Sequence, residues 1–160
     1  MSSPPNAASP WWDDMRVEEC INVAADRESV WRHVSAPEQY AEFMAGSAWK
    51  PVPGEPTTGS RARFEIAIEV GSIDLGGIVE FVEWDPPHEL SWTNITGIDQ
   101  RGRWVLRDRD GQTEVTLRLS YQVPGGVLAL VASRLSRPVI RRDARRSLTA
   151  LKEIVEGGPT

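Results

Sequence analysis

Alternating apolar and polar positions predict several β-strands in the middle of the chain. The clearest run is residues 61–70, where Phe64, Ile66 and Ile68 alternate with polar residues. The same criterion predicts further strands at residues 15–23, 49–52, 75–84, 90–95, 102–109 and 113–123. Asp110-Gly111 is typical of a two-residue hairpin turn, so the last two strands are expected to pair antiparallel.

Two short helices are predicted after the first strand. Asp26 is a suitable N-cap for the first helix, whose apolar stripe ends before Pro37. The second helix is expected over residues 37–44, with proline at its first position.

A longer helical region is predicted from Gly125-Gly126 to about residue 156. The apolar stripe of residues 128–139 and that of residues 140–155 lie on different faces of an ideal helix. Because Pro138 removes a backbone hydrogen bond, we expect a kink or short break there, with a partly mobile segment over 126–136.

The order of elements predicts an α+β fold in which the long helix covers one face of an antiparallel sheet. A chain of 160 residues suits one domain, expected over 15–157, after a disordered tail of residues 1–14. Residues 75–84 leave two registers open, because the opposite phase would turn Glu80 and Trp84 inward. Gly76-Gly77 is expected to mark a bulge or bend.

Composition excludes several kinds of site. A net charge of −5 argues against nucleic acid as a partner. The single cysteine, Cys20, excludes an intrachain disulfide and a zinc site built on paired cysteines. Neither His33 nor His88 stands in a catalytic pattern, and no motif indicates a metal site or a cofactor. We therefore predict no catalytic residue, no metal and no cofactor. No apolar run reaches the length of a membrane span, and the expected location is the cytoplasm.

Arginines gather between Arg134 and Arg146, in the middle of the last helical region. The simpler interpretation is a solvated helix face. The alternative is contact with an anionic membrane surface or an acidic partner protein.

Four segments carry a resemblance to a known family. They are INVAADRESVWRHVSAPEQYAEFM, VEFVEWDPPHELSWT, RWVLRDRDGQTEVTLRLSY and RRSLTALKEIVE. With them the chain resembles the START-like (SRPBCC, helix-grip) superfamily, in its polyketide cyclase/dehydrase and lipid transport branch. The resemblance implies a curved antiparallel sheet wrapped around a long C-terminal helix, with a ligand cavity between them.

The alternation selects the residues that would face such a cavity. They are Phe43, Met44, Phe64, Ile66, Ile68, Val79, Phe81, Trp92, Asn94, Trp104, Leu106, Leu117, Leu119, Tyr121, Leu128, Val131 and Leu135. The first hypothesis is a carrier or sensor that binds a hydrophobic or amphipathic small molecule, such as a lipid or polyketide. The second is an aromatase/cyclase that uses the same cavity, and the third is a protein-interaction domain with a filled core. Whether the chain is an enzyme stays open at this point.

Overall fold

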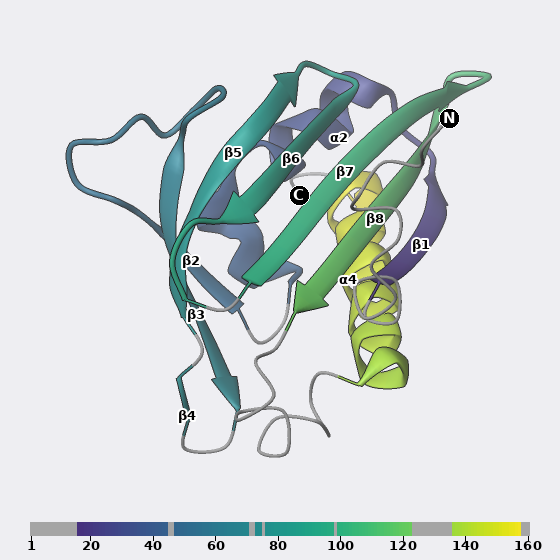
Figure 1. The fold of residues 1–160 in the computed structure, drawn as a ribbon. Helices are drawn as coiled ribbons and strands as arrows, with labels where there is room; N and C mark the ends of the chain where they lie inside the picture. Colours follow the sequence, from purple (N-terminus) through teal and green to yellow (C-terminus); the bar gives the residue numbers. More distant parts are fainter. Residues whose placement is uncertain are drawn as a thin grey trace, which may run out of the picture.

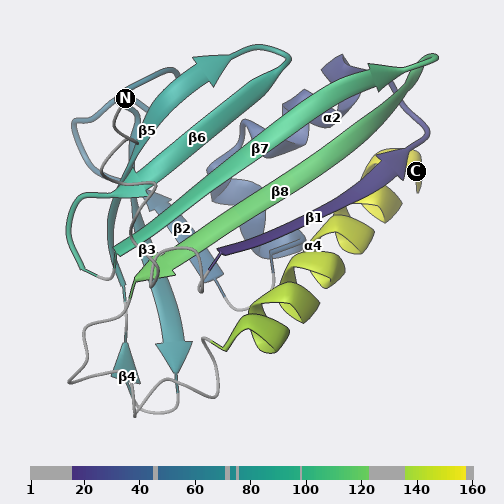
Figure 2. The ribbon, with the colours of Figure 1, turned by 45° about the vertical axis from the view of Figure 1, so that its right-hand side comes forward.

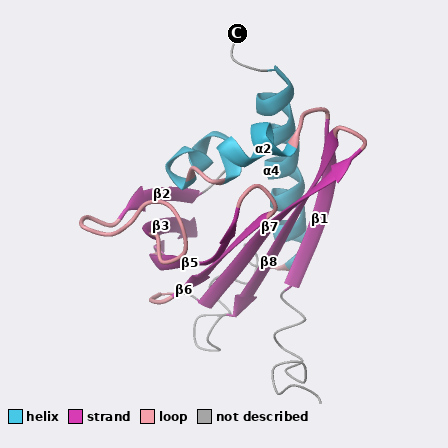
Figure 3. Cartoon of the chain, turned by 90° about the horizontal axis from the view of Figure 1, so that it is seen from above, coloured by secondary structure: helices cyan, strands magenta, loops and turns pink. Residues whose placement is uncertain are grey.

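An antiparallel sheet forms the centre of the molecule. A computed structural model of the chain describes residues 16–44, 47–70, 73–74, 76–97, 99–122 and 136–157. The strands follow the order β1-β8-β7-β6-β5-β3-β2, and the short β4 pairs with β3. Their bounds are β1 (Arg16–Val23), β2 (Ser47–Pro51), β3 (Arg63–Val70), β4 (Ile73–Asp74), β5 (Gly77–Asp85), β6 (Glu89–Asn94), β7 (Asp99–Arg109) and β8 (Gln112–Gln122). The sheet is curved and the helices lie on one side of it (Figure 1 and Figure 3), which confirms the predicted α+β helix-grip architecture.

The β7–β8 hairpin is longer than the sequence predicted. Asp110 and Gly111 have φ angles of 56° and 86°, as the expected two-residue turn requires. Pairing continues from Arg109↔Gln112 to Asp99↔Gln122, so β7 begins three residues before the predicted start at Gly102. This extension adds Gln100 to the inner face of the sheet.

The two short helical elements follow β1 as predicted. In α2 (Arg27–Val34), the Asp26 carboxylate accepts a hydrogen bond from the Ser29 backbone N–H at 2.9 Å, which confirms the N-cap. The second element, η2 (Pro37–Glu42), is a 3₁₀-helix that begins with proline. Both elements bury residues against the inner face of the sheet.

A β-bulge in β5 decides between the two registers that the sequence left open. Val79 and Phe81 are buried, and the pairing with β6 then shifts between Phe81 and Glu83. Because of this shift Trp84 also turns inward and packs edge-on against Phe81 at 5.2 Å. The expected bulge at Gly76-Gly77 was therefore placed too early. Gly77 instead permits a close approach, since a Cβ there would lie 2.2 Å from the Thr96 carbonyl oxygen.

The C-terminal helix, α4 (Arg137–Gly157), runs alongside β1 (Figure 2). Its buried apolar residues include Ile140, Ala144, Leu148 and Leu151, the stripe predicted for residues 140–155. Pro138 lies in its first turn, where the missing N–H costs nothing. The helix thus begins at the predicted break. The tail, residues 1–14, and the segment 126–135 lie outside the described residues, so the predictions about them stay predictions.

Candidate ligand-binding site

Three polar side chains form a row across the inner face of the sheet. Gln100 on β7 pairs with Tyr121 on β8. Thr93 on β6 pairs with Arg101 on β7, so the next residue of β6, Asn94, lies beside Gln100. In the other direction Asn94 pairs with the apolar Val79. Asn94 is the last residue of β6, and Gln100 and Tyr121 lie near the free ends of β7 and β8 (Figure 1). We call Asn94, Gln100 and Tyr121 the inner polar row.

A chain of hydrogen bonds connects this row to the core. The Trp92 Nε1–H donates to Gln100 Oε1 at 3.4 Å, and Gln100 Nε2 donates to the Tyr121 hydroxyl at 2.8 Å. Among the described residues nothing accepts the proton of the Tyr121 hydroxyl, so that group is free to donate. The row therefore presents a hydrogen-bond donor at Tyr121.

Asn94 presents the complementary acceptor. Its Nδ2 donates to the Thr96 carbonyl at 3.5 Å, a long contact, whereas its Oδ1 is buried and accepts no hydrogen bond from the described residues. A buried carbonyl oxygen without a partner costs about 1–3 kcal/mol, so such groups usually have a function or a bound partner. A ligand that donates a hydrogen bond to Asn94 Oδ1 would remove this cost.

Burial keeps Tyr121 in its neutral form. Loss of solvent raises the pKa of its hydroxyl, the hydrogen bond from Gln100 lowers it, and the charge of Asp143 raises it further. Burial also raises the pKa of the other tyrosine, Tyr40, whose hydroxyl donates to the Val34 carbonyl. The Trp104 indole N–H faces the Tyr40 hydroxyl and opposes this rise, but its geometry falls short of a hydrogen bond. Because it stays protonated, the Tyr121 hydroxyl is suited to donate a hydrogen bond and not to act as a base.

Most of the predicted lining residues are brought together in one core. Phe43, Phe64, Ile66, Val79, Phe81, Trp92, Trp104, Leu106, Leu117, Leu119 and Tyr121 are buried there, and Met44 packs against them. Asn94 is half-buried at the end of β6. The side chain of Ile68, and Leu128, Val131 and Leu135, lie outside what the structure describes.

Aromatic rings fill the part of this core that lies under η2. Tyr40 contacts Trp49 and Trp104 with ring centroids 4.9 and 6.4 Å apart, and Trp49 lies 5.3 Å from Trp92. Rings packed this closely leave no space for a ligand between them. Ligand contact by the other predicted residues, Asn94 and Tyr121 among them, stays a prediction.

Sequence reasoning missed Gln100. Its strand was predicted to begin at Gly102, although the alternation of Trp104 and Gly102 continues backwards to position 100. Gln100 is 5% exposed and connects Trp92 with Tyr121. The signal was present in the two-residue period, but a polar residue at an inward position did not meet the apolar criterion.

The arginines of the last helix are exposed, as a solvated face requires. Arg141 and Arg145 contact the Glu19 carboxylate at 3.4 and 2.7 Å, and Arg134 lies outside the described residues. Contact of this cluster with a membrane or an acidic partner stays a prediction. In the described part of the chain, no helix is long and apolar enough to cross a membrane. Across the same residues no cluster of His, Cys, Asp or Glu could hold a metal ion.

Comparison with known proteins gives a family and a fold. The family described as "Polyketide cyclase / dehydrase and lipid transport" matches residues 14–156. A search of curated proteins finds no match. Among solved structures, TTHA0849 from Thermus thermophilus has 22% sequence identity and a TM-score of 0.70, covering 91% of this chain and 99% of its own.

Two further structures share the fold at lower identity. The Zhui aromatase/cyclase from Streptomyces sp. R1128 has 19% identity and a TM-score of 0.67, covering 88% of this chain and 93% of its own. Ara h 8.0201 has 11% identity and a TM-score of 0.62, covering 89% of this chain and 98% of its own. At these identities the likeness concerns the fold alone.

Proposed function

The chain belongs to the polyketide cyclase/dehydrase and lipid transport family, and we propose that it binds a hydrophobic small molecule that carries a hydroxyl or carbonyl group. The ligand would lie against the inner face of the sheet, with its polar group at the inner polar row. Family and fold support a protein that binds a hydrophobic ligand or acts as a cyclase. The observation that carries the finer proposal is the unpaired, buried Oδ1 of Asn94 in the same row as the free donor of Tyr121, with Gln100 between them.

The chemistry of the row favours a molecule with a hydroxyl group. A phenol or alcohol both donates and accepts, so its hydroxyl can either donate to Asn94 Oδ1 or accept from the Tyr121 hydroxyl. A purely apolar ligand would leave Asn94 Oδ1 unpaired, and a charged one would lose its hydration without gaining a counter-ion in this row. The apolar residues around the row would bind the carbon skeleton.

The same groups argue for binding more than for turnover. A cyclase-type enzyme would need a group that takes up protons as well as one that donates them. Tyr121 is the titratable member of the inner polar row, and burial holds its pKa above the ordinary value. It would therefore remain protonated and act as a donor. An aromatase/cyclase function would rest on this donor alone.

Titration with two matched probes tests the proposal. By isothermal titration calorimetry we expect the chain to bind 2-naphthol with a Kd on the order of 10 μM, as for a well-placed ligand of this size. Naphthalene, which lacks the hydroxyl, should bind about 3–10-fold more weakly, the value of one net hydrogen bond. Asn94→Ala or Tyr121→Phe, whichever deletes the partner of the probe hydroxyl, should remove most of this preference.

Tyr40→Phe is the matched control, because it deletes the other tyrosine hydroxyl of the chain, which donates to Val34 and not to a ligand. It should leave the preference for 2-naphthol unchanged. Absence of saturable binding of both probes to the folded protein would refute the binding function. Equal affinity for the two probes would refute the role of the polar row.

A further inference from the structure

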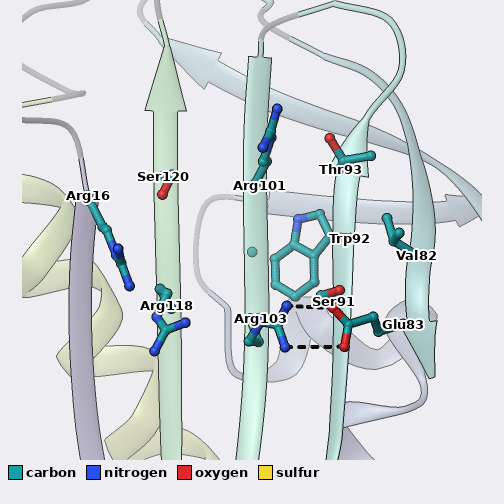
Figure 4. Close-up of a pocket in the computed structure, with 11 residues that line it drawn as sticks. Arg16, Val82, Glu83, Ser91, Trp92, Thr93, Arg101, Arg103, Arg118 and Ser120 are labelled. Carbon is teal, nitrogen blue, oxygen red and sulfur yellow. Dashed lines mark hydrogen bonds and ion pairs between the residues drawn. The ribbon is translucent and has the colours of Figure 1, made fainter. Parts of the chain in front are cut away.

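The outer face of the sheet, which points away from the core, carries a groove with a volume of about 450 Å³. It crosses the strands, and its lining includes Arg16 on β1, Ser120 on β8, Gly102 on β7, Ser91 on β6 and Val82 on β5. Figure 4 shows Arg16 at one end of the groove and Val82 at the other. The inner polar row lies on the opposite face of the sheet, so this groove and the proposed ligand site are separate.

A small outward-facing side chain leaves room for the hollow. Ser91 lies on the outer face between the buried Leu90 and Trp92, yet it is only 8% exposed. It pairs with Glu83 on one side and with Arg103 on the other, and these two larger side chains form an ion pair at 2.6 Å. Ser91 therefore lies at the bottom of the groove, beside this ion pair.

The β5 end of the groove is apolar and exposed. Val82, the extra residue at the β5 bulge, is 54% exposed. In the described part of the chain only one other large apolar side chain is exposed, Ile95, and it lies outside the groove. Next to Val82, the Arg103 guanidinium is held by Glu83 at 2.6 Å and Glu89 at 3.0 Å. A guanidinium fixed in this way presents its flat face to an aromatic ring, so this end suits an aromatic side chain.

The β1 end of the groove is basic. Among the residues that the structure describes, no carboxylate contacts Arg16, whereas Arg118 contacts Glu18 at 2.6 Å. Figure 4 shows the Arg16 side chain extending toward Arg118. This end therefore has two guanidinium groups and one carboxylate, and it suits an acidic side chain.

The chain itself enters the sheet at the basic end, because β1 begins at Arg16. The four residues at positions 11–14 are Trp-Trp-Asp-Asp. Residues 2–10 contain only Ser, Pro, Asn and Ala, which have little to bury. Moving away from Arg16 along the chain, the acidic residues come before the aromatic ones. The groove has the same order, with its basic end at β1 and its apolar end at β5.

The length of chain is sufficient for this match. Neighbouring strands lie about 4.8 Å apart, so β6 and β5 are about 14 and 19 Å from β1. An extended chain spans about 3.3 Å per residue, so Trp12 can lie about 13 Å from Arg16 and Trp11 about 17 Å. The indole side chains extend the reach further. Both rings can therefore reach the β5–β6 end of the groove, while Asp13 and Asp14 stay near its basic end.

We propose that residues 11–14 of the same chain dock in this groove, with an indole ring against Val82 and Arg103 and the carboxylates beside Arg16. The segment is attached at one end of the groove, so its effective concentration there is in the millimolar range and individually weak contacts suffice. The same attachment favours the chain's own segment over that of a second copy. Docking would order residues 11–14 and leave residues 1–10 as the disordered tail.

NMR spectroscopy of the full chain tests the proposal. Trp11→Phe and Trp12→Phe, each alone, assign the two indole N–H signals among those of the seven tryptophans. We expect at least one of the two to have the steady-state ¹⁵N NOE of a rigid group, close to that of the buried Trp104 indole. The same ring should give proton NOE contacts to the Val82 methyl groups. The ¹⁵N NOE of a mobile tail at both indoles would overturn the proposal.

Val82→Asp should release the ring, because a carboxylate replaces the apolar end of the groove, and we expect the docking equilibrium to fall at least tenfold. Ile95→Asp is the matched control, since it makes the same change at the other exposed apolar residue, outside the groove. It should leave the indole signals unchanged.

Three results of this comparison would overturn docking within the chain. The first is an unchanged indole signal in Val82→Asp. The second is an equal loss in Ile95→Asp, which would indicate a general effect of added negative charge. The third is loss of the NOE contacts on tenfold dilution, which would assign the groove to the segment of a second copy.

Discussion

Replacing Gly102 with alanine tests whether the Trp92 ring rests directly on the backbone of β7. A Cβ at position 102 would lie 2.0 Å from Cζ2 of Trp92, with two more ring atoms at 2.4 and 2.5 Å. Nonbonded carbon atoms rest about 3.5–4.0 Å apart, so the ring would have to move by roughly 1.5 Å.

Little space is available for that movement. The Trp92 ring centroid lies 5.3 Å from that of Trp49 and 6.1 Å from that of Phe81. Overpacking of this kind costs about 1–3 kcal/mol, and loss of the bond from Trp92 to Gln100 adds about 1 kcal/mol. The lower entropy of the unfolded alanine chain offsets about 0.4–1 kcal/mol. We therefore expect Gly102→Ala to lower the free energy of unfolding by about 2 kcal/mol.

Urea denaturation followed by far-UV circular dichroism measures this loss, and near-UV circular dichroism reports the Trp92 environment. Gly157→Ala is the control, because a Cβ there meets no atom within 4 Å, and it should be close to neutral. In a Trp92→Phe background the smaller ring should accept the methyl group, so Gly102→Ala should then cost less than about 1 kcal/mol.

A Gly102→Ala protein as stable as the wild type, with an unchanged near-UV spectrum, would refute the packing described for Trp92. An equal loss in the wild-type and Trp92→Phe backgrounds would place the cause in the β7 backbone and not in the ring.

Two further predictions concern the core and the α2 N-cap. Trp104→Ala should lower the free energy of unfolding by about 3–5 kcal/mol in urea, since the ring is fully buried, and a loss below about 1 kcal/mol would contradict its place in the core. Hydrogen bonds from Ser29 hold the pKa of Asp26 below its ordinary value of 3.8, so its stabilisation is present above that pH and is lost as the pH falls below it. Asp26→Asn should therefore lose less stability than the wild type between about pH 6 and pH 3 in parallel urea titrations. Identical losses in the two proteins would show that Asp26 contributes nothing to acid sensitivity.

Local interactions explain why much of the fold could be predicted. The Asp26 cap and the Asp110-Gly111 turn depend on contacts within a few residues, so their residue types are sufficient signals. The two-residue alternation in β3 and β8 likewise follows from burial of one face. The break at Pro138 rests on the missing N–H of one residue.

The β5 bulge and the extension of β7 required the neighbouring strands. Either phase of residues 75–84 places apolar side chains inward, and only pairing with β6 shows that Val79 and Trp84 both face the core. Gln100 joins the inner face because β8 continues far enough to pair with it. A polar residue at an inward position is acceptable only when partners are present, and those partners, Trp92 and Tyr121, come from other strands.

The sequence by itself determined the kind of elements, their order and the residues that form the core, because periodicity and turn chemistry act over short distances. Only the tertiary structure decided which polar groups share a site. Asn94, Gln100 and Tyr121 are scattered along the chain, whereas the sequence drew attention to the arginine-rich segment 134–146. The three residues form a row only when antiparallel register aligns β6, β7 and β8. That register depends on how the whole apolar face is buried against the helices, a property of many residues acting together.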